Sequence, residues 1–329
     1  MNTETALKKP AAINSSFVDE GHRTKEAPLG HALVALAKNN PRIVGMSADL
    51  AKYTDLHIFA AAFPERFFQM GMAEQLMLTA AGGLAKEGFI PFASTYGTFA
   101  SRRGADFINQ AIAEQHANVK IIGSLPGLST GYGPSHQATD DMAILRAAPK
   151  LTVIDPCDAL ETEQAAAAIA AYDGPVYMRG LRGNVPLVLD EYGYQFELGK
   201  AKLLLGGSDV IVMSTGLMTM RALDAAKVLA QDRVSVAVLH IPTVKPLDTM
   251  AIVQEARRTG RLVVVAENHS VVGGLGEAIA GVLIRAGVSP AFRQIALPDD
   301  FMVPGTLPVL HERYGLSTNA VVRQIKCWL

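Results

Sequence analysis

The alternation of short apolar runs with helical stretches, along nearly the whole chain, most constrains the fold. Apolar runs at 43–46, 119–122 and 151–154 are separated by segments such as 73–86 and 158–171, in which apolar residues recur at helical spacing. Short runs that are apolar on both faces are typical of buried parallel strands, and the helices between them supply the crossovers. We therefore expect an α/β protein with mainly parallel sheets and helices on both faces.

This alternation of apolar runs and helical stretches is interrupted once and then resumes, which predicts two consecutive α/β domains. The break falls between 183 and 207, where glycines and a proline interrupt the pattern, and a strand at 209–214 and a helix at 217–231 follow it. A chain of 329 residues also fits two domains of about 150 residues each. We predict a flexible arm over 1–22, a first domain over 23–190 and a second over 191–329.

The composition excludes several classes of protein. Hydrophobic residues make up 49% of the chain and charged residues 19%, which is too apolar for a disordered protein. The net charge of −1 gives no basic surface for nucleic acid or anionic lipid. No apolar run approaches the ~18 residues of a membrane span, and Cys157 and Cys327 match no metal or redox spacing. We expect a soluble cytoplasmic protein with no metal of its own and no nucleic-acid or membrane partner.

Candidate functional residues lie in loops that follow predicted strands, where open α/β sheets bind their ligands. Glu74 begins a helix after a strand at 66–69, and Tyr96 and Phe99 follow a strand at 89–93. His136 ends a loop over 123–137 that holds four glycines and two prolines. Taken singly, each has an ordinary structural interpretation. Glu74 suits a first-turn carboxylate at a helix dipole, the two aromatic residues suit a core, and His136 suits a helix cap.

The order and spacing of several motifs are more specific than any single residue. Together they resemble the pyrimidine-binding domain of the transketolase family, and the second half of the chain resembles that family's C-terminal domain. The resemblance covers the chain from about residue 24 to the end and implies the thiamine-diphosphate pyrimidine-binding fold followed by a transketolase C-terminal-like domain. The motifs are Ser47-Ala48-Asp49-Leu50, Gly71-Met72-Ala73-Glu74-Gln75, Ala93-Ser94-Thr95-Tyr96-x-Thr98-Phe99-x-x-Arg102, Gly131-x-Gly133-Pro134-Ser135-His136-Gln137 and Tyr177-x-Arg179-x-x-Arg182-Gly183.

The resemblance implies roles for cofactor-binding residues. Glu74 corresponds to the carboxyl group that bonds the aminopyrimidine of thiamine diphosphate and favours the tautomer that takes the proton from the thiazolium carbon. Phe99 would stack on the pyrimidine and Tyr96 would flank it. Asp49 and Arg102 correspond to further cofactor-site positions.

The resemblance also implies a substrate site. His136 would donate to an oxyanion or alkoxide that develops on the substrate, and Arg182 corresponds to an arginine that grips phosphate. Lys25 lies near another phosphate position. Tyr132 stands where ordinary transketolases have an aspartate that binds a sugar hydroxyl, so we expect an unusual donor. Apulose 4-phosphate is the specific donor that we predict, with an aldose phosphate such as glyceraldehyde 3-phosphate as acceptor of the two-carbon unit.

One family motif is missing from the chain. Complete transketolases bind the diphosphate through Mg²⁺ with a Gly-Asp-Gly motif followed by an asparagine, and no Gly-Asp-Gly occurs in this sequence. The resemblance therefore implies one subunit of a split transketolase, active only with a partner that carries Mg²⁺ and the diphosphate. A heterotetramer of two copies of each chain is the expected assembly.

Two other functions remain open, the β subunit of a 2-oxo-acid dehydrogenase and a catalytically inert scaffold of the same fold. The sequence Gly273-Gly274-Leu275-Gly276 is weak support for a nucleotide site, and close packing of strand, turn and helix explains it better. Cys157 suits a buried filler better than a nucleophile.

Overall fold

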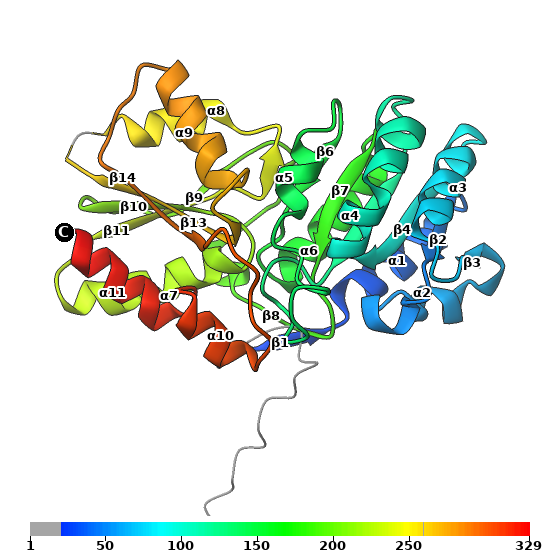
Figure 1. Cartoon of the computed structure of the whole chain (residues 1–329), viewed down its shortest axis with the longest axis horizontal. Helices are drawn as coiled ribbons and strands as arrows, with labels where there is room; N and C mark the ends of the chain where they lie inside the picture. Colours follow the sequence, from blue (N-terminus) through cyan, green and yellow to red (C-terminus); the bar gives the residue numbers. More distant parts are fainter. Residues whose placement is uncertain (1–20, 259) are drawn as a thin grey trace, which may run out of the picture.

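Two α/β domains lie side by side in the computed structural model, which describes residues 21–258 and 260–329 (Figure 1). Each domain holds a mostly parallel sheet with helices on both faces, which confirms the predicted fold class. The predicted arm over 1–22 lies outside the described residues except for its last two positions. Within the described ranges, no helix combines the length and apolar character that crossing a bilayer requires.

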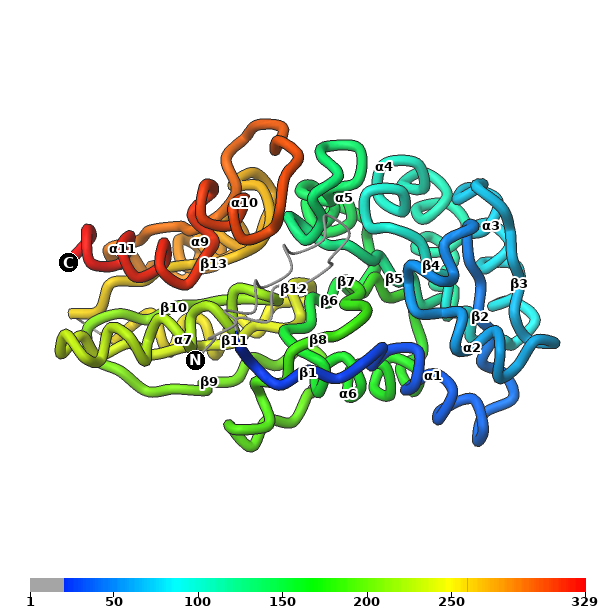
Figure 2. Tube along the Cα trace, turned by 90° about the horizontal axis from the view of Figure 1, so that it is seen from below, coloured from blue at the N-terminus to red at the C-terminus, as the bar shows by residue number. Residues whose placement is uncertain are grey.

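The first sheet has seven strands in the order β12-β6-β7-β5-β4-β2-β3. All of its pairings are parallel except that of β12 with β6. Helices α1, α2 and α6 cover one face, and α3, α4 and α5 cover the other (Figure 2). The bounds are β2 Ile43–Ser47, β3 Phe67–Gln69, β4 Ile90–Tyr96, β5 Lys120–Ser124, β6 Thr152–Ile154, β7 Val176–Gly180, β12 Thr243–Lys245, α1 Pro28–Asn39, α2 His57–Ala62, α3 Glu74–Lys86, α4 Gly97–Phe107, α5 Asp141–Arg146 and α6 Ala159–Ala171.

The central strands read as continuous apolar runs because alternate side chains enter two different cores. On β5, Ile121 packs with the core under α3 and α4, whereas Ile122 packs with the core under α1 and α6. Val153 and Ile154 on β6 divide in the same way. Since successive strand residues point to opposite faces, a strand covered on both faces needs apolar residues at every position.

The second sheet has five strands in the order β14-β13-β10-β11-β9, of which β9 is antiparallel to β11. Helices α7, α10 and α11 pack on one face, and α8 and α9 pack on the other (Figure 1). The bounds are β9 Lys202–Leu205, β10 Val210–Ser214, β11 Val236–His240, β13 Leu262–Ser270, β14 Phe292–Leu297, α7 Leu217–Gln231, α8 Thr249–Ala256, α9 Leu275–Arg285, α10 Leu307–Arg313 and α11 Thr318–Trp328.

The two domains share structure rather than meeting only at a linker. Strand β12 comes from the second half of the sequence but pairs with β6 in the first sheet. At the junction, β1 (Thr24–Glu26) pairs with β8 (Asn184–Pro186), and the two lie side by side in Figure 2. The sequence did not predict these three strands, whose pairing partners lie far away along the chain.

One element boundary at the candidate site differs from that predicted. Strand β4 continues to Tyr96, so residues 94–96 belong to the sheet and not to the loop that we predicted after residue 93. Helix α4 begins at once at Gly97 and ends at Phe107 in a stretch of π-helix, Ile108–Ala113. Pairing with β2 and β5 on both sides extends β4 further than local sequence indicates.

A buried arginine connects the strand ends of the first sheet. Arg179, at the end of β7 and only 1% exposed, donates through Nε to the Asp141 carboxylate at 3.0 Å. It also contacts Asp155 at 3.4 Å and donates to the Asn268 carbonyl of the second domain at 3.1 Å. Burial raises the pKa of Asp155 to about 6. Burial also acts to raise the pKa of Asp141, but the charge and hydrogen bonds of Arg179, together with His269 and Tyr177, lower it overall.

Arg179→Met should destabilise the protein by about 3–5 kcal/mol at pH 7, because it leaves two buried carboxylates without their cation. The free energy of unfolding from denaturant titration measures this. The loss should be smaller at pH 5, where protonation relieves the buried charge in the variant. The exposed Arg293, whose guanidinium bonds the neighbouring Phe292 carbonyl, supplies the control Arg293→Met, with a change within about 0.5 kcal/mol. Equal stability of the two variants would show that the buried network is dispensable.

Candidate active site

The predicted site residues follow five strands that are neighbours in the first sheet. Asp49 comes after β2, Glu74 after β3, Tyr96 at the end of β4, His136 in the loop after β5, and Arg182 after β7. Because these strands are parallel, their carboxyl ends lie at one edge of the sheet, which is where such sheets bind ligands.

Four ring side chains meet at this edge. The ring centroids of Tyr96 and Phe99 lie 5.5 Å apart, and the imidazole of His136 lies 5.9 Å from the first and 5.5 Å from the second. Tyr132 packs edge-on against His136 at 5.4 Å. These separations are typical of tilted and edge-to-face aromatic contacts. The structure thus brings together the two aromatic residues and the histidine that the sequence predicted.

Glu74 is the buried acid of the cluster. It is the first residue of α3, its side chain is only 3% exposed, and its Oε1 accepts a hydrogen bond from Nη1 of Arg103 at 2.9 Å. The Arg103 guanidinium also lies over the Phe99 ring, 3.9 Å from the centroid. A buried carboxylate beside aromatic faces fits a flat heterocycle that carries hydrogen-bonding nitrogens, which is the chemistry of an aminopyrimidine.

Arg102, the neighbour of Arg103, braces the histidine loop. Its Nε donates to the Asp140 carboxylate at 3.0 Å, and its Nη1 donates to the Pro134 carbonyl at 3.0 Å. Asp140 lies just beyond the loop and Pro134 within it, so Arg102 ties both to α4. In this structure Arg102 positions the segment that carries His136, and its role in cofactor binding remains a prediction.

The second domain also braces the histidine loop, through contacts with residues 127–131. Asn268 Oδ1 accepts from the Leu128 amide at 2.8 Å, and the buried His311 ring bonds the Leu128 carbonyl at 2.6 Å. Gly127 has a φ of +57° and a Cβ there would collide with Asn268, so both the conformation and the close approach require glycine. The second domain therefore holds one wall of the candidate site in place.

Asp49, Arg182 and Lys25 lie outside the ring cluster. Asp49 is exposed at a φ of +60°, with its amide bonded to Gln69 Oε1 at 2.7 Å. Burial raises the pKa of Tyr96, and the positive charge of Arg182 opposes that shift, so Arg182 acts on the cluster electrostatically. The Lys25 ammonium pairs with Glu163 at 2.6 Å. The roles of these three residues remain predictions.

The surroundings of His136 favour the neutral form of its imidazole. Its Nδ1 lies 2.9 Å from the Ser135 hydroxyl. Partial burial lowers the pKa of His136, and the positive charge of Arg103 lowers it further. A neutral imidazole at pH 7 can donate one hydrogen bond to a substrate oxygen or accept one proton from it.

Close packing explains the glycine-rich turn of the second domain, residues 273–276, and this was one of the two interpretations that the sequence offered. Glu267 accepts from the amides of Leu275 and Gly276 at the start of α9, which is the position that a phosphate would take in a nucleotide site. Burial raises the pKa of Glu267 to about 7. Any side chain at Gly274 would collide with this carboxyl group. Burial likewise raises the pKa of the Cys157 thiol well above its usual value, which fits an inert filler.

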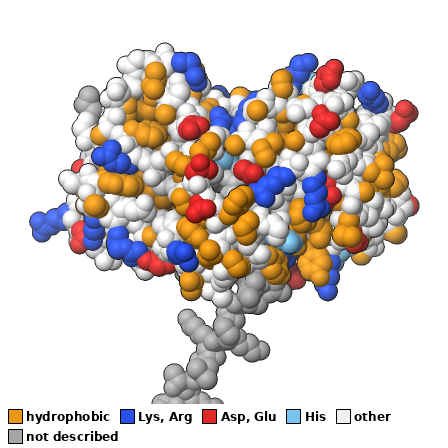
Figure 3. All heavy atoms as spheres, in the orientation of Figure 1, with side chains coloured by type: hydrophobic (Ala, Val, Ile, Leu, Met, Phe, Trp, Pro, Cys, Tyr) orange, Lys and Arg blue, Asp and Glu red, His pale blue; other side chains and the backbone are white. Residues whose placement is uncertain are grey.

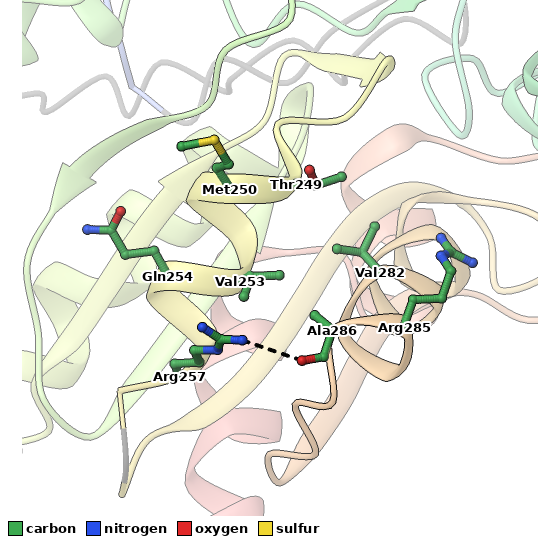
Figure 4. Close-up of a pocket in the computed structure, with 8 residues that line it drawn as sticks. All are labelled: Thr249, Met250, Val253, Gln254, Arg257, Val282, Arg285 and Ala286. Carbon is green, nitrogen blue, oxygen red and sulfur yellow. Dashed lines mark hydrogen bonds between the residues drawn. The ribbon is translucent and has the colours of Figure 1, made fainter.

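A cavity of about 770 Å³ opens between α8 and α9, and it contains none of the predicted site residues (Figure 4). Arg257 lies along it and donates to the Ala286 carbonyl at 3.4 Å, while the exposed Met250 stands at its rim. Its lining holds neither an acid nor a histidine, so we assign it no part in the chemistry. The lining residues are Thr249, Met250, Val253, Gln254, Arg257, Val282, Arg285 and Ala286.

Comparison with known proteins places the chain in a family. Residues 24–188 match the family described as transketolase, pyrimidine binding domain, and residues 199–321 match transketolase, C-terminal domain. The chain belongs to the transketolase family. It is 60% identical to an uncharacterized transketolase family protein of Sinorhizobium fredii over 329 residues, which cover 100% of this chain and 95% of that protein.

Other transketolase relatives are named as subunits. The 6-deoxy-6-sulfo-D-fructose transketolase subunit SqwH of a Clostridium species is 40% identical over 292 residues, which cover 88% of this chain and 90% of that one. A solved structure described as a split gene transketolase, inactive beta4 tetramer, superposes with a TM-score of 0.83 at 40% identity. The match covers 92% of this chain and 98% of that one. This chain is therefore a transketolase-type subunit of the size found in split-gene enzymes.

Sequence reasoning missed Arg103, which the structure places at the centre of the candidate site. The signal was present, because Phe99 and Arg103 are four residues apart on a helix and must share a face. The pairing with Glu74 joins two helices and was not visible from local spacing.

The electrostatic effect of Arg103 on His136 makes a testable prediction about protonation. The pKa of His136 should lie below 6.5 in the isolated chain, so the imidazole should be neutral at pH 7. Arg103→Met should raise it, because the variant removes a nearby positive charge and leaves the burial. NMR titration of the imidazole C2–H, with His136→Gln for assignment, measures both values. An unchanged pKa in Arg103→Met would show that the guanidinium does not act on this ring.

Proposed function

We propose that this chain is the pyrimidine-binding subunit of a thiamine-diphosphate-dependent transketolase that moves a two-carbon ketol unit from a ketose phosphate to an aldose phosphate. The observation that carries the proposal is the buried Glu74 carboxylate beside the Phe99 ring, with His136 facing that ring. A carboxylate in such surroundings is suited to bond a ring nitrogen or amino group, and the family generally uses this cofactor.

The residues at the sheet edge have different roles in the proposed reaction. The bound cofactor supplies the nucleophilic carbon, which protein side chains lack. Glu74 would bond the aminopyrimidine, Phe99 would stack on it and Tyr96 would flank it. His136 would move protons at the substrate hydroxyl and carbonyl oxygens. Tyr132, 44% exposed beside His136, borders the space where the sugar lies.

We infer that the rest of the site comes from a partner subunit. The sequence holds no Gly-Asp-Gly motif, and two transketolase relatives of similar length are described as a subunit and as a split-gene enzyme. The partner would hold the diphosphate and Mg²⁺, in an assembly of two copies of each chain. Exposed hydrophobic side chains next to Glu74 support an interface there: Met72 is 83% exposed and Leu76 55%. Figure 3 shows hydrophobic side chains at the end of the molecule that α3 and β3 form.

The donor that we propose is a ketose with an anionic terminal group. Arg182 offers a charge for that group, and Tyr132 removes the carboxylate that ordinary transketolases place near the sugar. Apulose 4-phosphate is our leading donor, and a sulfonated ketose is the competing possibility because one relative is named for 6-deoxy-6-sulfo-D-fructose. A donor panel on the reconstituted complex ranks these against common pentulose phosphates.

Glu74→Gln should lower kcat of the reconstituted complex by at least about 100-fold, because the amide cannot exchange a proton with the ring. Subunit assembly should persist, since the two side chains have the same shape. Steady-state turnover together with size-exclusion chromatography measures both properties. The exposed Glu65 supplies the control Glu65→Gln, which should keep wild-type turnover.

Near-normal turnover of Glu74→Gln would contradict the proposed function. Stable capture of a lipoyl-bearing partner would favour the 2-oxo-acid dehydrogenase alternative instead. Failure of the complex to bind thiamine diphosphate would favour an inert scaffold.

Leu76→Glu should disrupt association between chains, because it places a charge in the exposed apolar surface that Leu76 forms with Met72. Light scattering after size-exclusion chromatography should show a smaller species than wild type at equal concentration. The 77% exposed Ile284 on α9 supplies the control Ile284→Glu, which should leave the mass unchanged. An unchanged mass for Leu76→Glu would place the interface elsewhere.

A further inference from the structure

Arg103 makes two contacts that an aminopyrimidine would itself need. Its guanidinium centre lies 3.9 Å above the Phe99 ring, which is stacking distance for a flat group. From the same place, one guanidinium nitrogen donates to Glu74 at 2.9 Å. The Arg103 guanidinium, a planar group with N–H donors, thus already packs on the Phe99 ring and hydrogen-bonds the Glu74 carboxylate.

These contacts exclude a second flat group from the same position. Glu74 is 3% exposed while its partner Arg103 is 49% exposed, so the arginine is the solvent-facing member of the pair. A heterocycle that stacks on this face of Phe99 and bonds Glu74 must take the place of the guanidinium. Arg103 can leave, because the ion pair of a half-exposed cation is weak.

We propose that Arg103 is a positioning residue that stands in for the pyrimidine ring in the cofactor-free subunit and must be displaced before the cofactor binds. This inference rests on the proposed function and adds a competing ligand built into the chain. Before cofactor binds, Arg103 keeps Glu74 paired and Phe99 covered. The apparent affinity for thiamine diphosphate therefore falls as the fraction of subunits in which Arg103 occupies the site rises.

Two substitutions separate the roles of charge and shape. Arg103→Met removes the donor and the planar cation, whereas Arg103→Lys keeps the charge and loses the flat fork. Thiamine diphosphate is titrated by calorimetry, with Mg²⁺ present, into the complex with the proposed partner subunit, which is expected to carry Gly-Asp-Gly. Arg103→Met should bind about tenfold more tightly than wild type, with Arg103→Lys between them. The control Arg293→Met should bind as wild type does.

A crystal structure of the complex with and without cofactor gives a second readout that does not depend on affinity. The guanidinium should lie over Phe99 without cofactor and point to solvent with it. Equal or weaker binding by Arg103→Met, or a guanidinium that keeps its place on Phe99 in the loaded complex, would overturn the inference while leaving the proposed function intact. Absence of thiamine diphosphate binding to the wild-type complex would overturn both.

Discussion

Parallel pairing of β2, β4, β5 and β7 is the constraint on which the site depends. It brings the carboxyl ends of strands from distant parts of the sequence to one edge, so residues 74, 96 and 136 can meet. The buried charge of Arg179 reinforces this edge by linking the end of β7 to Asp141 and to the backbone of the second domain. The site is therefore a consequence of the topology, which brings side chains from distant parts of the sequence into contact with one another.

The second domain supports the site without supplying its predicted residues. Asn268 and His311 hold the backbone of the histidine loop, and β12 joins the first sheet as an edge strand. Its glycine-rich turn, which resembles a nucleotide motif in sequence alone, is filled by the carboxyl group of Glu267. The second domain is thus a brace for a long loop that has little regular structure of its own.

Sequence reasoning predicted the fold class and most of the ring cluster, because these depend on periodicity and ordered motifs. Glu74, Phe99 and His136 were found in this way, and the structure places them around one edge. It could not predict that Arg103 pairs with Glu74, nor that Arg102 braces the histidine loop, since neighbouring positions on a helix point to different partners. Tertiary packing determines that Arg103 faces Glu74 and that Arg102 faces Asp140.

The most direct test of the account is the structure of the assembled enzyme with thiamine diphosphate. The measured quantity is the distance from the Glu74 carboxyl oxygens to the nearest pyrimidine nitrogen. The account predicts a hydrogen bond of about 2.6–3.0 Å, with the diphosphate and Mg²⁺ on the partner subunit. A pyrimidine ring bound away from Glu74, or a complete cofactor site formed by this chain alone, would contradict it.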